Sequence, residues 1–181
     1  LDVLFVHSNS QQINYQALSN SQTALEPNIW AGLLANSCRS KGFAVAILDC
    51  EVDNLSHLNS AKEIINYDSR FVCFTIFGSN PNASTQSMAG AILTAQKLKE
   101  LKPDVKIIFV GNHVSSLPEE TINESCVDII LLNEGVYALH NLLQVTNPYD
   151  DYQLGKVKGI AFKDSEGNAN FNDYEQIVLP E

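Results

Sequence analysis

The sequence has little positive charge and no long apolar run. Its 11 lysine and arginine residues are outnumbered by 21 aspartate and glutamate residues, which gives a net charge of −10 at pH 7. Nucleic acids need a basic partner surface, so this charge excludes a nucleic-acid-binding protein. A membrane-spanning helix needs a run of about 18 or more apolar residues, so we expect no membrane partner.

Cysteine is sparse, and its placement excludes two further classes. The four cysteines, Cys38, Cys50, Cys73 and Cys126, are widely separated and have none of the spacings of zinc sites or disulfide frameworks. Three of them fall in apolar segments, which is typical of reduced, structural cysteines. Since no signal peptide is recognisable either, the sequence predicts a cytoplasmic protein.

Several catalytic and nucleotide-binding motifs are also missing. There is no G-x-G-x-x-G after the first apolar segment and no G-x-x-x-x-G-K-[ST], so dinucleotide-binding and P-loop proteins are excluded. H-E-x-x-H, C-x-x-C and G-x-S-x-G are absent as well. A phosphoacceptor domain would need acidic residues after its first and third strands, where this chain has His7-Ser8-Asn9 and Gly78-Ser79.

What the sequence does contain is an alternation of buried strands and helices. With 181 residues and 45% apolar content, the chain can bury one good core. Helices are expected between the strands and after the last one, so the pattern predicts an α/β fold: a Rossmann-like, open five-stranded parallel sheet with helices on both faces. The expected strands are 3–6, 44–48, 71–77, 107–110 and 129–132.

Local signals give the expected helix boundaries. Pro27 opens a helix that Gly42 ends, with an apolar face formed by Ile29, Trp30, Leu33, Leu34 and Cys38. Other predicted features are a cap at Ser84 or Thr85 for the next long helix, a capping box of Ser116 with Glu119 around Pro118, and a last helix that begins at Gly135.

The C-terminal part of the chain is different in kind. Residues 158–163 and 169–172 are predicted to form a β-hairpin around the turn 164–167. Because a lone hairpin is marginal in water, we expect it to lie over the domain or to lead into a further one. Residues 8–26 are polar and without periodicity, which is typical of a functional or disordered loop.

Small polar residues follow the predicted strands. Parallel strands end at one edge of the sheet, so these residues should form a common binding rim. Such side chains let backbone amides approach a bulky ligand closely, which suits a large, nearly neutral ligand rich in amides. The candidate binding residues are His7, Ser8, Asn9, Thr75, Phe77, Gly78, Ser79, Ser84, Thr85, Gly111, Asn112, His113, Asn133, Glu134 and Gly135.

Ordered motifs over about 150 residues then resemble one family. They are Pro27 to Asp49, with a G-x-x-V-x-x-x-D pattern; Gly111-Asn112-His113 with Leu117-Pro118-Glu119; Val127-Asp128 before Asn133-Glu134-Gly135; and Gly159-Ile160-Ala161-Phe162 before Leu179-Pro180. This set is similar to the N-terminal cobalamin (B12)-binding domain of cobalamin-dependent radical S-adenosylmethionine (SAM) enzymes. The resemblance assigns residues 1–147 to that domain and residues 148–181 to a linker and hairpin leading to a C-terminal radical SAM domain.

The chain departs from the family pattern at several positions. Asn112 and Asn133 replace glycines, and Val136 replaces a glutamate. The D-x-H-x-x-G signature of cobalamin mutases is absent, because His7 has Phe5 and Ser10 where that signature has Asp and Gly. The resemblance therefore implies base-off cobalamin without a histidine ligand below cobalt. Its dimethylbenzimidazole tail would insert beside the third and fourth strands, close to Thr75.

The resemblance also implies partners, and it implies that binding and catalysis belong to different domains. In the family a [4Fe-4S] cluster and SAM support methyl transfer or related radical chemistry, but the cluster motif C-x-x-x-C-x-x-C is absent here. This chain should therefore bind cobalamin without catalysing a reaction alone. Two alternatives remain open: an interaction or regulatory module that has lost the cofactor, and an enzyme that binds another small ligand at the same edge.

Most candidate residues also have a purely structural interpretation. His7 can be a polar loop residue and not a metal ligand, and His113 can order its loop. Gly111 and Gly135 can serve tight turns, and Glu134 can favour a helix dipole. Thr75 can bond its own backbone. Ser84 and Thr85 can be helix caps, and Trp30 and Met88 are expected in the core.

Overall fold

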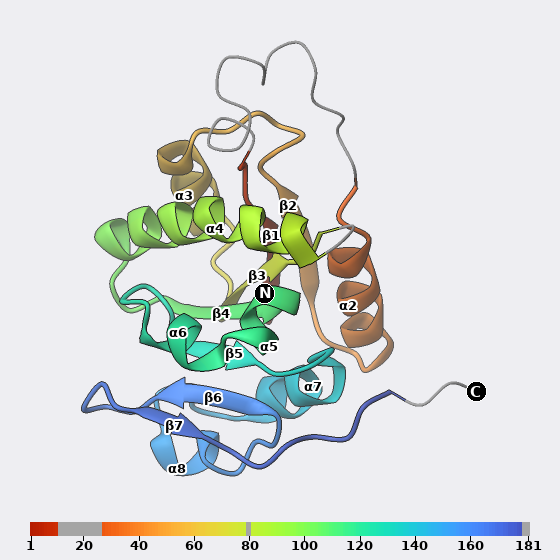
Figure 1. The fold of residues 1–181 in the computed structure, drawn as a ribbon, viewed down its shortest axis with the longest axis vertical. Coiled ribbons are helices and arrows are strands. Elements are labelled where there is room, and N and C mark those ends of the chain that lie inside the picture. The colour runs from red at the N-terminus through yellow and green to blue at the C-terminus, as the bar shows by residue number, and fades with distance from the viewer. Residues whose placement is uncertain (11–26, 79–80, 179–181) are drawn as a thin grey trace.

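The computed structural model describes residues 1–10, 27–78 and 81–178. In this part of the chain, seven strands form one sheet in the order β2-β1-β3-β4-β5-β6-β7 (Figure 1). The strands are β1 (Val3–His7), β2 (Val45–Asp49), β3 (Phe71–Ile76), β4 (Lys106–Gly111), β5 (Ile129–Leu131), β6 (Ile160–Lys163) and β7 (Ala169–Phe171). The helices are α2 (Ile29–Ser40), α3 (His57–Asn66), α4 (Pro81–Leu101), α5 (Asn112–Ser116), α6 (Pro118–Asn123), α7 (Val136–Gln144) and α8 (Asp151–Leu154).

The first five strands are parallel, as the alternating pattern predicts. The apolar sequences of β1, β3, β4 and β5 are buried on both sides because helices cover both faces of the sheet, whereas the edge strand β2 is only partly buried. One face packs against α3, α4, α5 and α6, and the other packs against α2, α7 and α8. The predicted α/β class, with an open parallel sheet between two helical layers, is confirmed.

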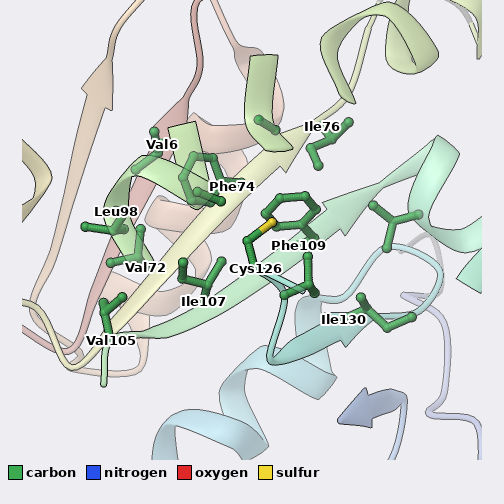
Figure 2. Close-up of a cluster of buried hydrophobic side chains, with 14 of the residues drawn as sticks. Val6, Val72, Phe74, Ile76, Leu98, Val105, Ile107, Phe109, Cys126 and Ile130 are labelled. Atoms are coloured by element: carbon green, nitrogen blue, oxygen red, sulfur yellow. The ribbon is translucent and has the colours of Figure 1, made fainter. Parts of the chain in front are cut away.

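The core is densest where β3 and β4 lie side by side (Figure 2). The rings of Phe74 and Phe109 meet with centroids 5.3 Å apart and a tilt of 55°. Both side chains are fully buried, together with Val72 and Ile107 on the same face and Leu98 from α4. This packing fixes the height at which the two central strands end, and so it positions the loops that follow them.

The hairpin extends the sheet and does not lie over it. β6 pairs antiparallel with β5, with Ile130 opposite Ala161, and β7 pairs antiparallel with β6. Gly167 takes φ +86° in the predicted turn. Joining an existing sheet edge satisfies the backbone groups of β6 and removes the exposed edge that β5 would otherwise present.

Helix α2 buries Leu34 and Cys38 of the predicted apolar face, but it also buries two alanines that were not predicted. Its buried residues are Ala31, Leu34, Ala35 and Cys38. Ile29 is 67% exposed, Leu33 55% and Trp30 42%, so the prediction that these three form the inner face is wrong. Small alanines let the helix approach the sheet closely, and that contact outweighs the larger apolar residues. Gly42 ends the helix region at φ +89°, as predicted.

Two predicted helix caps are also wrong. Helix α4 begins at Pro81, so Ser84 and Thr85 lie inside it and do not cap it. The Ser116 hydroxyl donates to Asn112 O at 2.8 Å and makes no capping box, because the segment forms two short helices, α5 and α6. Pro118 does occupy the first turn of α6. Met88 is buried in the core as expected.

No helix in the described residues is long and apolar enough to cross a lipid bilayer.

Candidate functional site

The C-terminal ends of the parallel strands bring most of the predicted binding residues to one edge. His7 ends β1, Thr75 is the last residue but one of β3, and Gly111 ends β4. The register places His7 opposite Asp49 and Ile76 opposite Gly111, so these strands end at nearly the same level. The loop 133–135 follows β5 at the same edge. Ser79 lies outside the described residues, and Gly78 is half-buried just after β3.

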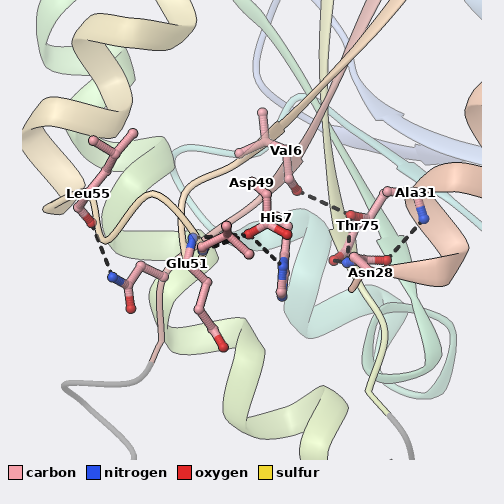
Figure 3. Close-up of polar contacts among 10 residues, drawn as sticks. Val6, His7, Asn28, Ala31, Asp49, Glu51, Leu55 and Thr75 are labelled. Atoms are coloured by element: carbon pink, nitrogen blue, oxygen red, sulfur yellow. Dashed lines mark hydrogen bonds and ion pairs between the residues drawn. The ribbon is translucent and has the colours of Figure 1, made fainter. Parts of the chain in front are cut away.

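At one side of this rim, His7 is held by an acidic neighbour (Figure 3). His7 Nδ1 donates to Asp49 Oδ1 at 3.2 Å. The same oxygen accepts the backbone amides of Glu51 and Val52, both at 3.1 Å. Burial raises the pKa of Asp49, but the hydrogen bonds from His7 and the two amides outweigh it, so the pKa lies below 3.8. Asp49 is therefore a carboxylate that fixes the His7 ring.

Beside this pair, Asn28 clamps the start of α2 to the end of β3 (Figure 3). Asn28 Nδ2 donates to the carbonyl oxygen of Thr75 at 3.2 Å and to Thr75 Oγ1 at 3.0 Å. Asn28 Oδ1 accepts the amide of Ala31 at 2.9 Å and thereby caps the helix. Thr75 Oγ1 in turn donates to Val6 O at 3.2 Å. The hydroxyl of Thr75 is thus bonded within the protein, and sequence reasoning missed Asn28 altogether.

An aromatic contact reinforces the same junction. The rings of Trp30 and Phe77 stack with centroids 4.8 Å apart. Phe77 is buried, whereas Trp30 keeps 42% of its surface exposed, so the prediction of Trp30 as a core residue is wrong. The space next to Thr75 is therefore filled by the first turn of α2.

The segment after β1 is buried on the face of the sheet that α3 and α4 cover. Ser8, Asn9 and Ser10 are each less than a tenth exposed. Asn9 Nδ2 donates to Leu55 O at 3.3 Å, and Ser10 Oγ donates to Ser87 O at 3.3 Å. Ser8 and Asn9 are therefore packed inside the protein and do not line an open rim.

At the end of β4, Gly111 is required by the neighbouring strand. A Cβ atom at Gly111 would lie 1.9 Å from Ile76 O, which is far inside van der Waals contact. The same carbonyl oxygen accepts the hydroxyl of Ser84 at 2.7 Å. Gly111 and Ser84 thus let β3, β4 and α4 meet closely, so their structural roles are sufficient to account for them.

The exposed part of the rim carries side chains that can form hydrogen bonds. His113 Nδ1 and Thr85 Oγ1 share a hydrogen bond at 3.1 Å, which joins α5 to α4. Asn112 and Asn133 are exposed. Ser115 Oγ donates to Asn133 O at 3.4 Å and links the loops after β4 and β5.

Two left-handed residues shape the loop after β5. Asn133 has φ +55° and Gly135 has φ +70°. A Cβ atom at Gly135 would lie 3.0 Å from Leu131 Cβ, so the turn is tight on its inner side. Between them, Glu134 Oε2 accepts the amide of Val178 at 2.9 Å. Glu134 is therefore directed to a later part of the chain.

The described residues of this rim carry groups that can form hydrogen bonds. Among the described residues, no group of three or more histidine, cysteine or acidic side chains could hold a metal ion. The four cysteines are free and buried. What the edge offers is backbone amides, side-chain amides, hydroxyls and the half-buried imidazole of His113, around the ends of parallel strands.

Fold and site together define a Rossmann-like ligand-binding domain, and a family model identifies its class. Residues 17–143 match the B12-binding domain. This match covers more than half of the chain, so the chain belongs to the B12-binding domain family. The resemblance that the sequence motifs indicate is thereby confirmed.

Three relatives illustrate the similarity. An uncharacterized methyltransferase of Pyrococcus horikoshii, PH0819, is 26% identical over 140 residues, which are 77% of this chain and 28% of that protein. The structure of TsrM from Kitasatospora setae, a radical SAM methyltransferase, matches 94% of this chain and 30% of its own, with a TM-score of 0.71 and 15% identity. That of OxsB, a cobalamin-dependent SAM radical enzyme with aqua-cobalamin and SAM bound, matches 97% of this chain and 22% of its own, with a TM-score of 0.62 and 19% identity.

The sequence given therefore spans less than a third of each of these three proteins. At these identities the two structures show a shared fold.

Proposed function

We propose that this chain binds cobalamin at the C-terminal edge of its parallel sheet. The observation that carries the proposal is the convergence there of the loops after β3, β4 and β5, which bring Gly78, Asn112 and Asn133 to one rim. The match of residues 17–143 to the B12-binding domain supports it. OxsB, which has the same fold, has been solved with aqua-cobalamin bound.

The exposed residues of the rim fit this ligand chemically. Cobalamin carries many side-chain amides, which need donors and acceptors but no strong charge. Asn112 and Asn133 offer amides, and the His113–Thr85 pair offers an imidazole and a hydroxyl. These residues, with the backbone around Gly78, Gly111 and Gly135, would hold the corrin ring.

We propose the base-off state for the bound cofactor, without a histidine ligand below cobalt. The D-x-H-x-x-G signature is absent, and the ring of His7 is bonded to Asp49 through Nδ1. The nucleotide tail could reach Thr75 only if Asn28 gave up its two hydrogen bonds to that residue. Binding of the tail would therefore shift the first turn of α2.

Cobalamin supplies a cobalt centre that accepts and transfers methyl groups. We propose that this chain orients the cofactor and that a radical SAM domain elsewhere in the polypeptide holds SAM and a [4Fe-4S] cluster. The division into residues 1–147 and 148–181, with the latter leading to that domain, belongs to the same proposal, as does a cytoplasmic location. The much greater length of the three relatives supports it.

Titration with hydroxocobalamin tests this function. We expect binding of one cobalamin per chain with a change to the base-off absorption spectrum. Asn112→Asp and Asn133→Asp should weaken binding, because each replaces an amide donor with a carboxylate at an exposed position. Glu120→Gln on α6 is the matched surface control. An unchanged spectrum with the chain and with the whole polypeptide would reject the proposal.

A second candidate is an interaction module that keeps the fold without the cofactor. One observation favours it: Asn28 and Trp30 fill the space beside Thr75. The same titration separates the two functions, because the module would leave the spectrum of hydroxocobalamin unchanged.

A further inference from the structure

The chain does not leave the sheet freely after β7. Residues 173–178, here called the strap, run back past the start of β6 and along α7 (Figure 1). Asn172 N donates to Ile160 O at 3.1 Å, and Gly159 N donates to Asp173 O at 2.7 Å. The path of the strap is therefore set from its first residue.

Two side chains then hold the strap against the body of the domain. Glu134 Oε2, in the rim loop after β5, accepts the backbone amide of Val178 at 2.9 Å. Asn141 Nδ2, on α7, donates to Glu175 Oε2 at 2.9 Å. One of these contacts comes from the rim itself, and the other comes from the helix that begins directly after the rim loop.

The strap lies close to the domain but buries little apolar surface. A Cβ atom at Gly159 would lie 2.7 Å from Glu175 Cβ, so the strap is tightly seated there. In contrast, Tyr174 is 76% exposed, Ile177 53% and Val178 41%. Since apolar burial contributes little, the polar contacts of Glu134 and Asn141 must hold the far end of the strap.

The backbone of the rim loop, residues 133–135, restricts the position of Glu134. Asn133 and Gly135 on either side have left-handed backbone conformations, which fix the direction of the residue between them. A carboxylate that accepts an amide makes a stronger hydrogen bond than a neutral acceptor does. Glu134 is thus both oriented and chemically suited to hold a backbone amide.

We propose that Glu134 is a positioning residue that clamps the strap to the rim loop, so that the edge of the sheet and the outgoing chain move as one body. This role of Glu134 does not require that a ligand be bound. It means that the direction in which the chain leaves the domain is set by a residue of the rim, not by the hairpin alone.

Hydrogen–deuterium exchange of the strap tests the clamp in the chain as it is. Glu134→Ala should raise the exchange rate of the peptide containing residues 173–178 roughly fivefold, the factor expected for one lost hydrogen bond. Glu134→Gln keeps an acceptor oxygen at the same reach but loses the charge, so its exchange rate should fall between those of the wild type and Glu134→Ala. Glu134→Asp keeps the charge but is one methylene shorter, so it should resemble Glu134→Ala.

Asn141→Ala provides a second variant, which should raise exchange around Glu175 and leave Val178 protected. Exchange of β1 to β5 should be unchanged in all four variants, which shows that the fold is intact. Wild-type strap exchange in Glu134→Ala would overturn the clamp, and so would equal exchange in the Gln and Ala variants. If the wild type fails to bind hydroxocobalamin, the proposed function falls but this inference does not.

Discussion

At the scale of single residues, Asn28 does the most to shape the rim. Its position before Ile29 is a recognisable helix cap signal, which sequence reasoning did not use. Its second role, the bonds from Nδ2 to Thr75, joins residues 47 positions apart. A contact of that length has no local signature, so it could not be predicted from the pattern.

Substitutions at Asn28 should separate its two roles. Asn28→Asp keeps an oxygen that caps α2 but loses the donor to Thr75, whereas Asn28→Ala loses both. We expect Asn28→Ala to lower the free energy of unfolding by about 1–2 kcal/mol, since a lost cap alone costs about 1 kcal/mol. Asn28→Asp should lose less. Urea denaturation measures both, and equal losses in the two variants would contradict the assignment of the cap.

The cysteines should be unreactive in the folded state. Burial raises the pKa of Cys38 to about 12 and the pKa of Cys73 well above 9.0. For Cys50 and Cys126 burial is again the main cause, with a pKa of about 11 for each thiol. Because thiolates are the reactive form, a disulfide reagent at about pH 8 should label none of the four within minutes. In denaturant it should label all four, and fast labelling of the native chain would contradict this account.

At the scale of elements, the helix faces and caps that were predicted wrongly have structural causes. Periodicity identifies where a helix lies, but not which of two apolar faces the sheet accepts. In α2 the small residues Ala31 and Ala35 face the sheet, and the larger Ile29 and Leu33 do not. The capping pattern at Ser116 fails for another reason: α5 begins at Asn112 directly after β4 and includes Ser116, so Leu117 and not Ser116 occupies the position before α6.

Two glycines provide a matched test of close packing between elements. Gly42 has φ +89° with open space around its Cβ position, whereas a Cβ at Gly111 would collide with Ile76 O. Gly42→Ala should cost only the left-handed backbone penalty, about 1–2 kcal/mol. Gly111→Ala must also push β3 from β4 and should cost about 3 kcal/mol or more. Thermal denaturation of both variants checks the order, and an equal loss would contradict it.

Two histidines that connect helices should make stability depend on pH. Burial lowers the pKa of His57, which bonds Thr94 between α3 and α4. Burial, with Lys41 nearby, lowers the pKa of His140, which bonds Ser37 between α7 and α2. Both folded values lie below the ordinary 6.5, so the unfolded chain takes up protons first as the pH falls.

The free energy of unfolding should therefore be constant above about pH 7.5 and decrease as the pH falls through 6.5 towards the folded values. The double variant His57→Gln, His140→Gln should flatten this decrease in urea denaturation at several pH values. It should leave intact the separate loss below pH 3.8, where Asp49 takes up its proton. A decrease of the same size in the double variant would exclude the two histidines as its cause.

At the scale of the whole molecule, the parallel part of the sheet could be predicted because most of its strands are short, apolar and buried. The runs around Phe5, Phe74 and Phe109 have no other stable environment than the centre of such a sheet. The place of the β6–β7 hairpin could not be predicted in this way, because a hairpin can pair with any free edge of a sheet, and its sequence does not indicate which edge it joins.

The candidate site, too, could be predicted only in part. Topology alone brings the ends of β1, β3 and β4 together, so the rim follows from the order of the strands. The order of the strands does not determine which rim residues face outwards. Ser8 and Asn9 are buried, while Asn112 and Asn133 are exposed. Glu134 has the strap as its partner, a segment that lies 44 residues further along the chain.

The central claim is that cobalamin occupies the C-terminal edge of this sheet, and amide chemical-shift mapping tests it most directly. On addition of hydroxocobalamin to the isotope-labelled chain, the shifts should concentrate at Gly78, residues 111–115 and residues 133–135. Residues at the opposite edge, such as Arg70 and Lys106, should not move. An unchanged spectrum, or changes confined to that opposite edge, would contradict the account.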